Sequence, residues 1–173
     1  MKLSKIILAI ACVFFYTSIF SQSVGGVKFE NYPAKISNSK KANLNLYSHK
    51  LGRKFRTAIT EGYNNTNVDF GGHYVVILWG CGTGCSNGVM VDRNTGLIYS
   101  IPTEHSYRGV YYDNNENIRY EKNSYLFYTY ETLMNEKDEK KIDLHYYFYK
   151  FDEKTKKFNL ISRLNKTVES EDN

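Results

Sequence analysis

The chain has 173 residues, of which 42% are hydrophobic and 24% are charged, with 23 basic and 18 acidic side chains. These values exclude a wholly disordered chain and a protein that lies mostly within a membrane, and the length fits one domain. The aromatic residues are 16 Tyr and 10 Phe against a single Trp. This composition favours β-sheet, because aromatic side chains suit a pleated, half-buried surface.

Residues 1–21 have the organisation of a signal peptide. Lys2 and Lys5 precede an apolar run over 6–16, and Ser21 offers a small residue at a cleavage point. The run is about half the length that a permanent transmembrane helix needs. We therefore expect an exported protein, periplasmic or extracellular, with no transmembrane span after cleavage. Cleavage lowers the formal net charge from +5 to +3 by removing two lysines and no acid, which does not favour a nucleic-acid partner.

Cys12 leaves a second interpretation of the N-terminus open. The run Ala9-Ile10-Ala11-Cys12 resembles a lipobox, which would make the protein a lipoprotein. The apolar residues 13–16 continue the hydrophobic run instead of a polar linker, which favours a Cys12 that is discarded with the signal peptide.

The rest of the chain divides into an arm, a domain and a tail. Gly, Pro, Ser and Asn in residues 22–42 predict an irregular N-terminal arm with a short edge strand at 26–30. Residues 43–165 form the predicted single domain, and the acidic residues 166–173 are expected to be a frayed tail.

One helix is predicted at the start of the domain, over residues 43–62. Asn43 is the expected N-cap and Gly62 the expected C-cap. The periodicity that predicts the helix, with spacings of three and four, is carried by Leu44, Tyr47, Leu51, Phe55, Ala58 and Ile59.

Strand patterns dominate after residue 70. Residues 73–79 are apolar on both faces, which predicts a central strand covered on both sides. A glycine-rich reversal over 80–88 leads to a partner strand, and the Asp and Asn of the turn 92–96 can bond their own backbone. The further predicted strands are 97–101, 124–130, 145–151 and 157–162. The predicted fold is α+β, one N-terminal helix packed on an antiparallel β-meander of about five to seven strands.

Cys81 and Cys85 are the two cysteines left after signal cleavage. An even pair in an exported chain predicts a disulfide. The ring is small, so the expected stabilisation is about 2 kcal/mol, enough to stiffen a loop but not to hold a domain. Two interpretations stay open, a hairpin staple and a rigid loop that recognises a partner. The binding candidates for the second are Trp79, Gly82, Thr83, Gly84, Ser86 and Asn87.

His73 and His105 are candidate auxiliary residues. With the two cysteines they have the ligand types of a zinc site, and either could be the base of a catalytic cysteine. A histidine on an apolar strand is more typical of a satisfied core residue. Glu104, His105 and Asp113 form the best acid–base cluster, but no catalytic residue, metal or cofactor is assigned, and the sequence favours a protein that is not an enzyme.

Ten tyrosines in the second half of the chain allow two interpretations. They could line a sugar- or peptide-binding face, or they could fill and cap a small sheet. They are Tyr107, Tyr111, Tyr112, Tyr120, Tyr125, Tyr128, Tyr130, Tyr146, Tyr147 and Tyr149.

Residues 53–101 resemble an uncharacterised family of small exported bacterial proteins. The shared motifs are F-x-G-H-Y at 70–74, W-G-C-G-x-x-C at 79–85 and D-x-x-T-G at 92–96, with Phe55-Arg56-Thr57 before them. This resemblance implies no activity. A looser resemblance is to the Ivy-type periplasmic lysozyme inhibitors, in which a disulfide-closed loop carrying His and charged residues plugs the lysozyme cleft. Gly82-Thr83-Gly84 provides neither kind of residue.

The sequence thus predicts a small exported, non-enzymatic protein that binds a protein or glycan partner in the cell envelope. One alternative is a lysozyme-inhibitor-like or immunity-type inhibitor of a cell-wall hydrolase. The other is an enzyme of unknown chemistry that uses His73 or His105 near the loop 80–88.

Overall fold

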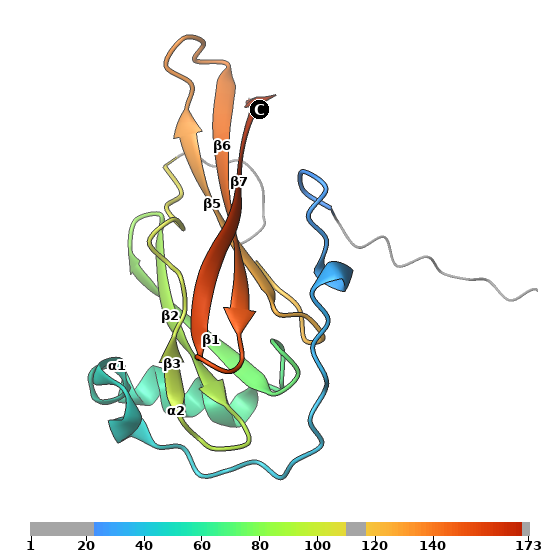
Figure 1. Cartoon of the computed structure of the whole chain (residues 1–173). Helices are drawn as coiled ribbons and strands as arrows, with labels where there is room; N and C mark the ends of the chain where they lie inside the picture. Colours follow the sequence, from blue (N-terminus) through green and yellow to red (C-terminus); the bar gives the residue numbers. More distant parts are fainter. Residues whose placement is uncertain (1–22, 110–116, 171–173) are drawn as a thin grey trace, which may run out of the picture.

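The computed structural model describes residues 23–109 and 117–170, in which the strands form two antiparallel sheets (Figure 1). The first sheet has the order β1-β2-β3, with β1 (Tyr74–Gly82), β2 (Cys85–Asp92) and β3 (Ile98–Ser100). The second has the order β4-β5-β6-β7, with β4 (Ile118–Tyr120), β5 (Leu126–Met134), β6 (Lys141–Asp152) and β7 (Lys157–Glu169). The predicted antiparallel pairing of the strands is confirmed. The strands form two sheets and not the single predicted meander, and β4 was not predicted. The predicted signal peptide and Cys12 lie outside the described residues.

The predicted single helix over 43–62 is wrong. Helical structure there consists of a 3₁₀ turn and two α-helices, namely η2 (Leu46–Ser48), α1 (Lys50–Lys54) and α2 (Arg56–Asn65). The physical reason is that polar side chains within the apolar pattern act as N-caps, so that new helical segments start there. The Asn45 side chain accepts a hydrogen bond from the Tyr47 N–H, and the His49 ring accepts one from the Leu51 N–H.

Gly62 is not a C-cap, because α2 continues past it to Asn65. Its role is close packing against the first sheet. A Cβ at Gly62 would lie 2.8 Å from the Cγ2 atom of Ile77 on β1. The absence of a side chain at Gly62 therefore lets α2 approach the strand closely.

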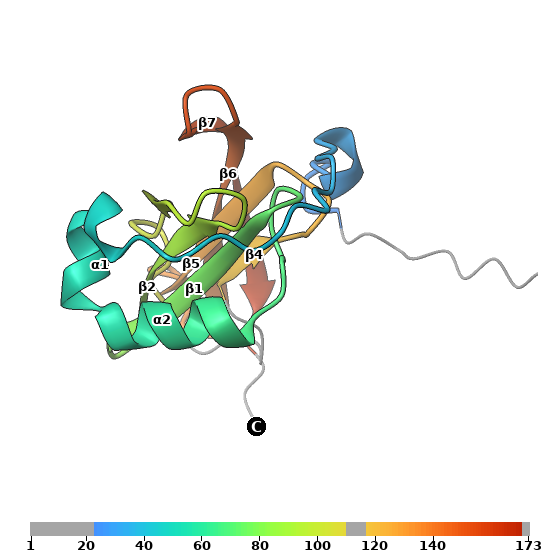
Figure 2. The same ribbon diagram turned by 90° about the horizontal axis from the view of Figure 1, so that it is seen from below.

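The elements stack in layers, with α2 on one face of the first sheet (Figure 2). Ile59 and Tyr63 of α2 are buried with residues of all three strands, Val75, Ile77, Val89, Val91 and Ile98. The other face of the first sheet packs on the second sheet through a core that includes Phe70, Tyr74, Val76, Met90, Phe127 and Phe151. The expectation that both faces of β1 are covered is confirmed, but β1 is an edge strand of its sheet and not a central one.

The N-terminal arm is irregular, as predicted, and runs beside the sheets (Figure 1), where apolar packing and backbone hydrogen bonds attach it at several points. The predicted strand at 26–30 is not formed; a 3₁₀ turn, η1 (Phe29–Asn31), takes part of its place. Phe29 is buried against Tyr128, with ring centroids 5.7 Å apart. The arm thereby covers the outer face of the second sheet. Backbone N–H groups then bond its later part to both sheets, Ala34 to Asn123 O, Ser37 to Gly72 O and Ala42 to Arg93 O.

Of the eight candidate tyrosines in the described residues, three are buried, four are half-buried and Tyr107 is exposed. Tyr128, Tyr130 and Tyr149 are no more than 6% exposed. In the outer core the Tyr128 ring packs against Phe148, and the Tyr130 ring packs against Tyr146. This arrangement supports the interpretation that the tyrosines fill the sheet. Tyr111 and Tyr112 lie outside the described residues.

The C-terminal segment differs from the expected frayed tail. β7 continues to Glu169, which pairs with Lys141 of β6. Residues 166–169 thus belong to the sheet. Val168 in this segment, like Leu164 before it, packs against the outer core and helps to hold the end of β7 in place.

Candidate functional site

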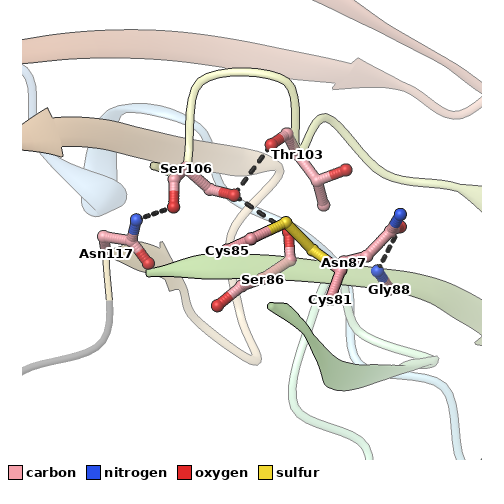
Figure 3. Close-up of a disulfide and its surroundings, with 8 residues drawn as sticks. All are labelled: Cys81, Cys85, Ser86, Asn87, Gly88, Thr103, Ser106 and Asn117. Atoms are coloured by element: carbon pink, nitrogen blue, oxygen red, sulfur yellow. Dashed lines mark hydrogen bonds between the residues drawn. A yellow bond between two sulfur atoms is a disulfide. The ribbon is translucent and has the colours of Figure 1, made fainter. Parts of the chain in front are cut away.

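The disulfide between Cys81 and Cys85 closes the hairpin of β1 and β2, which confirms the predicted pair (Figure 3). Their Cα atoms are 5.2 Å apart, within the usual range for a disulfide. β1 extends through Gly82 and β2 begins at Cys85, so that only Thr83 and Gly84 form the turn. The pairing shifts between Gly80 and Gly82, which leaves Cys81 as an extra residue in β1.

The hairpin tip is held from one side by the segment that follows β3. The Arg108 N–H donates to the Gly84 carbonyl at 2.8 Å. The Ser106 hydroxyl lies 3.0 Å from the Ser86 carbonyl oxygen and 2.7 Å from that of Thr103, and the Asn117 amide donates to the Ser106 carbonyl (Figure 3). The loop is therefore supported from one side as well as closed by the disulfide.

Gly84 is required by this contact. A Cβ there would lie 2.3 Å from the Arg108 carbonyl oxygen, and its φ is +69°. Both conditions exclude an ordinary side chain. The glycine content of the loop thus has one specific cause that the sequence did not reveal.

A cleft of about 410 Å³ opens where the hairpin meets this supporting segment. It is lined by Leu78, Trp79, Gly80, Gly84, Cys85, Ser86, Arg108 and Asn117. Three of the six predicted binding residues, Trp79, Gly84 and Ser86, are thus in the cleft. Of the others, Gly82 and Thr83 are exposed at the tip, and the Asn87 side chain turns back to accept from the Gly88 N–H at 2.7 Å.

Sequence reasoning missed Leu78, Arg108 and Asn117. Leu78 carries no signal beyond its place in an apolar strand. Arg108 and Asn117 come from the irregular segments after β3, and no local pattern places them beside the hairpin. Only the backbone bond from Arg108 to Gly84 and the side-chain bond from Asn117 reveal their position.

Trp79 is anchored at the base of the hairpin. Its ring stacks on Phe55, with centroids 4.5 Å apart and planes 24° apart. Its Nε1 atom is buried and has no hydrogen-bond acceptor among the described residues. A buried donor without an acceptor costs about 1–3 kcal/mol.

His73 lies at the opposite end of β1, in the turn before the strand and not on it. Its Nε2 atom is 3.8 Å from Asp92 Oδ1 and 3.4 Å from Glu153 Oε1. Asp92 ends β2 and Glu153 lies in the β6–β7 turn, so that this histidine joins the two sheets. It is not close to the cysteines.

His105 belongs to a different cluster on the second sheet. Its Nδ1 atom is 3.2 Å from Glu131 Oε1, and its ring stacks on Tyr147 with centroids 3.8 Å apart. The Tyr147 hydroxyl donates to Glu131 Oε2 at 3.3 Å. Burial raises the pKa of the Tyr147 phenol, and the charge of Glu131 raises it further. The phenol is therefore a hydrogen-bond donor at neutral pH and not a base.

The acid–base cluster predicted in this segment is not assembled in the described residues. The Glu104 carboxylate accepts a hydrogen bond from the Thr103 N–H at 3.0 Å instead of approaching His105. Asp113 lies outside the described residues.

A histidine–serine pair that sequence reasoning missed lies beside α1. His49 Nε2 is 3.0 Å from the Ser100 Oγ atom. His49 Nδ1 accepts from the Leu51 N–H, so that the neutral ring carries its proton on Nε2 and donates to Ser100. Burial, followed by the charge of Lys50, lowers the pKa of His49. A ring in this tautomer cannot take the Ser100 proton, and the pair does not form an activated nucleophile.

The zinc site considered from the sequence is not formed by these residues. Cys81 and Cys85 are joined to each other, and His73 and His105 lie in separate clusters. Within residues 23–109 and 117–170, no group of three or more His, Cys, Asp or Glu side chains is placed to hold a metal ion.

The described residues contain no helix that is both long enough and apolar enough to cross a membrane. Comparison of the chain with protein-family models, with curated proteins and with solved structures finds no match in any of the three. The resemblances to the two families of exported proteins therefore stay predictions, and the geometry of the cleft is the basis for assigning a function.

Proposed function

We propose that this protein is an exported, non-enzymatic binding protein whose disulfide-closed hairpin and adjoining cleft bind a protein or glycan partner in the cell envelope. The observation that carries the proposal is the 410 Å³ cleft at the hairpin, formed by three of the predicted binding residues together with Arg108 and Asn117. A pocket with a few convergent polar groups beside an apolar wall is the usual form of a recognition site.

Preorganisation supports this assignment. The disulfide closes the turn, and bonds from Arg108 and Ser106 hold its inner side, so that little conformational entropy is lost when a partner binds. Trp79 lines the cleft with a ring that is already fixed by its stacking on Phe55.

The separation of the histidines favours binding over catalysis. The cleft lining contains neither His73 nor His105, and the cavity that His73 lines contains no residue of the hairpin. A histidine-dependent reaction at the loop 80–88 would require one of these rings to reach the cleft.

The test begins with capture of envelope proteins and glycans by the purified protein without reductant. Each captured partner is then measured by calorimetry against the parent and against the double variant Cys81→Ser/Cys85→Ser. We expect the double variant to stay folded and to bind about 5- to 30-fold more weakly, equivalent to about 1–2 kcal/mol, through lost preorganisation.

A matched control is Thr155→Ser, an exposed position in the distant β6–β7 turn, which should bind like the parent. Parent-like affinity of a folded double variant would place the site elsewhere and contradict the proposal. Capture of a cell-wall hydrolase whose activity is blocked would specify the proposed function as inhibition.

A further inference from the structure

A second cavity, of about 360 Å³, lies at the end of β1 opposite the hairpin cleft. Its wall is formed by the arm, the segment after α2, the turn before β1, the β2–β3 turn and the β4–β5 turn. The lining residues are Ile36, Ser37, Asn38, Ser39, Asn67, Val68, His73, Arg93, Asn94 and Lys122. We propose that this cavity binds a tetrahedral oxyanion, the phosphate or sulfate group of a small ester.

The lining of this cavity is basic. None of the lining residues is Asp or Glu, whereas Arg93 and Lys122 are basic residues. Among the described residues, neither the Arg93 guanidinium nor the Lys122 ammonium makes a side-chain hydrogen bond or an ion pair. Two basic side chains that line one cavity, without an ion-pair partner among the described residues, create a positive potential that attracts an anion. The nearest carboxylates to His73, those of Asp92 and Glu153, face its Nε2 atom.

The cavity lining also carries hydrogen-bond donors that suit an oxyanion. An arginine fork can donate two parallel hydrogen bonds to an oxyanion, and a lysine ammonium adds a point charge. The Ser37 hydroxyl donates to Asn94 Oδ1 at 3.0 Å, which turns the Asn94 NH₂ group away from that contact and leaves it able to donate. The Ser37 hydroxyl has one proton, so while it donates to Asn94 the 2.9 Å contact between Ser37 Oγ and Ser39 Oγ uses the Ser39 proton. The lining therefore offers an oxyanion the arginine fork, the lysine ammonium and the Asn94 NH₂ group as donors.

Backbone hydrogen bonds fix the segments that carry these groups. The Arg93 N–H donates to His73 O at 2.8 Å, and the Gly72 N–H donates to Lys122 O at 2.7 Å. The Ser37 N–H donates to Gly72 O at 2.9 Å, which joins the arm to the same turn. A Cβ at Gly72 would lie 2.1 Å from the Lys35 carbonyl oxygen, so that the glycine permits this close approach. The cavity is thus held by the fold before a ligand arrives, which favours binding.

The size of the cavity indicates more than a bare ion. Its volume of about 360 Å³ leaves room beside an oxyanion for the small molecule that carries it. The exposed side chain of Ile36 at the rim provides an apolar contact for such a group. The site is separate from the hairpin cleft, and its test is independent of the proposed function.

The test is a titration followed by ¹H–¹⁵N NMR, with inorganic phosphate and inorganic sulfate as separate probes at constant ionic strength. Sodium chloride and sodium acetate are the reference salts. We expect saturable shifts of the backbone amides of Arg93, Asn94 and Lys122 with at least one tetrahedral anion and none with acetate. The two probes distinguish a phosphate site from a sulfate site.

The double variant Arg93→Gln/Lys122→Gln should raise the apparent Kd at least tenfold. The control Lys50→Gln/Arg56→Gln removes the same two charges from the exposed surface of α1 and α2 and should bind like the parent. Because Arg93 is half-buried, the single variant Lys122→Glu, at an exposed position, provides a second test that does not depend on core packing. Non-saturable shifts, equal loss in the control, or parent-like binding of Lys122→Glu would each overturn the proposal.

Discussion

The hydroxyl of Tyr74 lies 3.0 Å from each carboxylate oxygen of Glu153, across 79 residues of sequence. Tyr74 begins β1 in the first sheet, and Glu153 lies in the turn between β6 and β7 of the second. Lys156 completes the contact, since its ammonium donates to the Tyr74 oxygen at 2.6 Å and pairs with Glu153. Burial, followed by the charge of Glu153, raises the pKa of the Tyr74 phenol, which stays protonated at every physiological pH. The three residues join the two sheets at one end.

Removal of this hydroxyl should loosen the contact between the sheets. We expect Tyr74→Phe to lower the free energy of unfolding by about 1.5–3 kcal/mol, because a hydrogen bond to a charged group is lost while the ring keeps its packing. Urea denaturation followed by circular dichroism measures the change. The control is Tyr47→Phe, whose side chain is 83% exposed and which should behave like the parent. An unchanged midpoint for Tyr74→Phe would show that solvent replaces the bond at no cost.

Gly84 and Gly80 allow a matched test of the support for the hairpin. Gly84→Ala should destabilise the protein by about 1–3 kcal/mol, because the new Cβ meets the Arg108 carbonyl at 2.3 Å and the φ of +69° is unfavourable. Gly80→Ala places a Cβ with no atom within 4 Å and should be nearly neutral. Thermal unfolding of both variants gives the comparison. Equal effects would mean that the hairpin does not depend on its contact with Arg108.

Asp69 makes stability depend on pH. Burial raises the pKa of its carboxyl from 3.8 to about 6. The folded state therefore binds a proton more tightly than the unfolded state. The stabilisation that comes from this tighter proton binding amounts to at most about 3 kcal/mol. It is fully present below pH 3.8 and is lost as the pH rises through about 6.

Asp69→Asn isolates this contribution, because the amide oxygen can still accept from the Val76 N–H, which lies 2.9 Å from Asp69 Oδ1. The variant should be more stable than the parent at pH 7 and lose that advantage by pH 4, as measured by urea denaturation across this range. Asp138→Asn should show the opposite sign, since hydrogen bonds from Lys140 and Lys141 lower the pKa of Asp138. Parallel curves for Asp69→Asn and the parent would contradict the assignment.

At Gly62, helix propensity and packing have opposite effects on the stability of an alanine variant. Alanine in the interior of α2 gains about 1 kcal/mol of intrinsic helix stability over glycine. The new Cβ would lie 2.8 Å and 2.9 Å from two carbons of the buried Ile77 side chain, and such overpacking costs about 1–3 kcal/mol. We expect Gly62→Ala to be net destabilising, by about 1 kcal/mol, in a thermal melt. The double variant Gly62→Ala/Ile77→Ala, which removes both carbons, should lose less than the sum of the two single variants, whereas additive losses would show that Ile77 is not the obstacle.

Local patterns predicted those parts of the fold that depend on local chemistry. The turn at Asp92 is an example, because the Asp92 side chain accepts from the Asn94 N–H at 2.8 Å and Gly96 takes a φ of +76°. The turn at Asp152 has the same kind of hydrogen bond, since its carboxylate accepts from the Lys154 N–H at 2.9 Å. The cysteine pair was predicted from the two cysteines that remain in an expected exported chain, and the structure joins them.

Non-local contacts decided what the sequence could not reveal. The apolar periodicity of residues 44–59 is genuine, but the capping side chains of Asn45 and His49 divide it into separate segments. The division into two sheets depends on packing between strands far apart in the chain. Both cavities are formed by segments that meet only in the folded protein, and for this reason Arg108, Asn117, Arg93 and Lys122 carried no signal of their own.

The position of Trp79 has a practical consequence. It is the single tryptophan of the chain, it lines the hairpin cleft, and its ring stacks on Phe55. Fluorescence excited at the long-wavelength edge, where tryptophan absorbs and the 16 tyrosines do not, therefore reports on this one place in the molecule. Ligands that enter the cleft, and reduction of the neighbouring disulfide, should change the emission directly. An anion in the cavity beside Arg93, at the other end of β1, should leave it unchanged, so that a single optical signal separates the two sites.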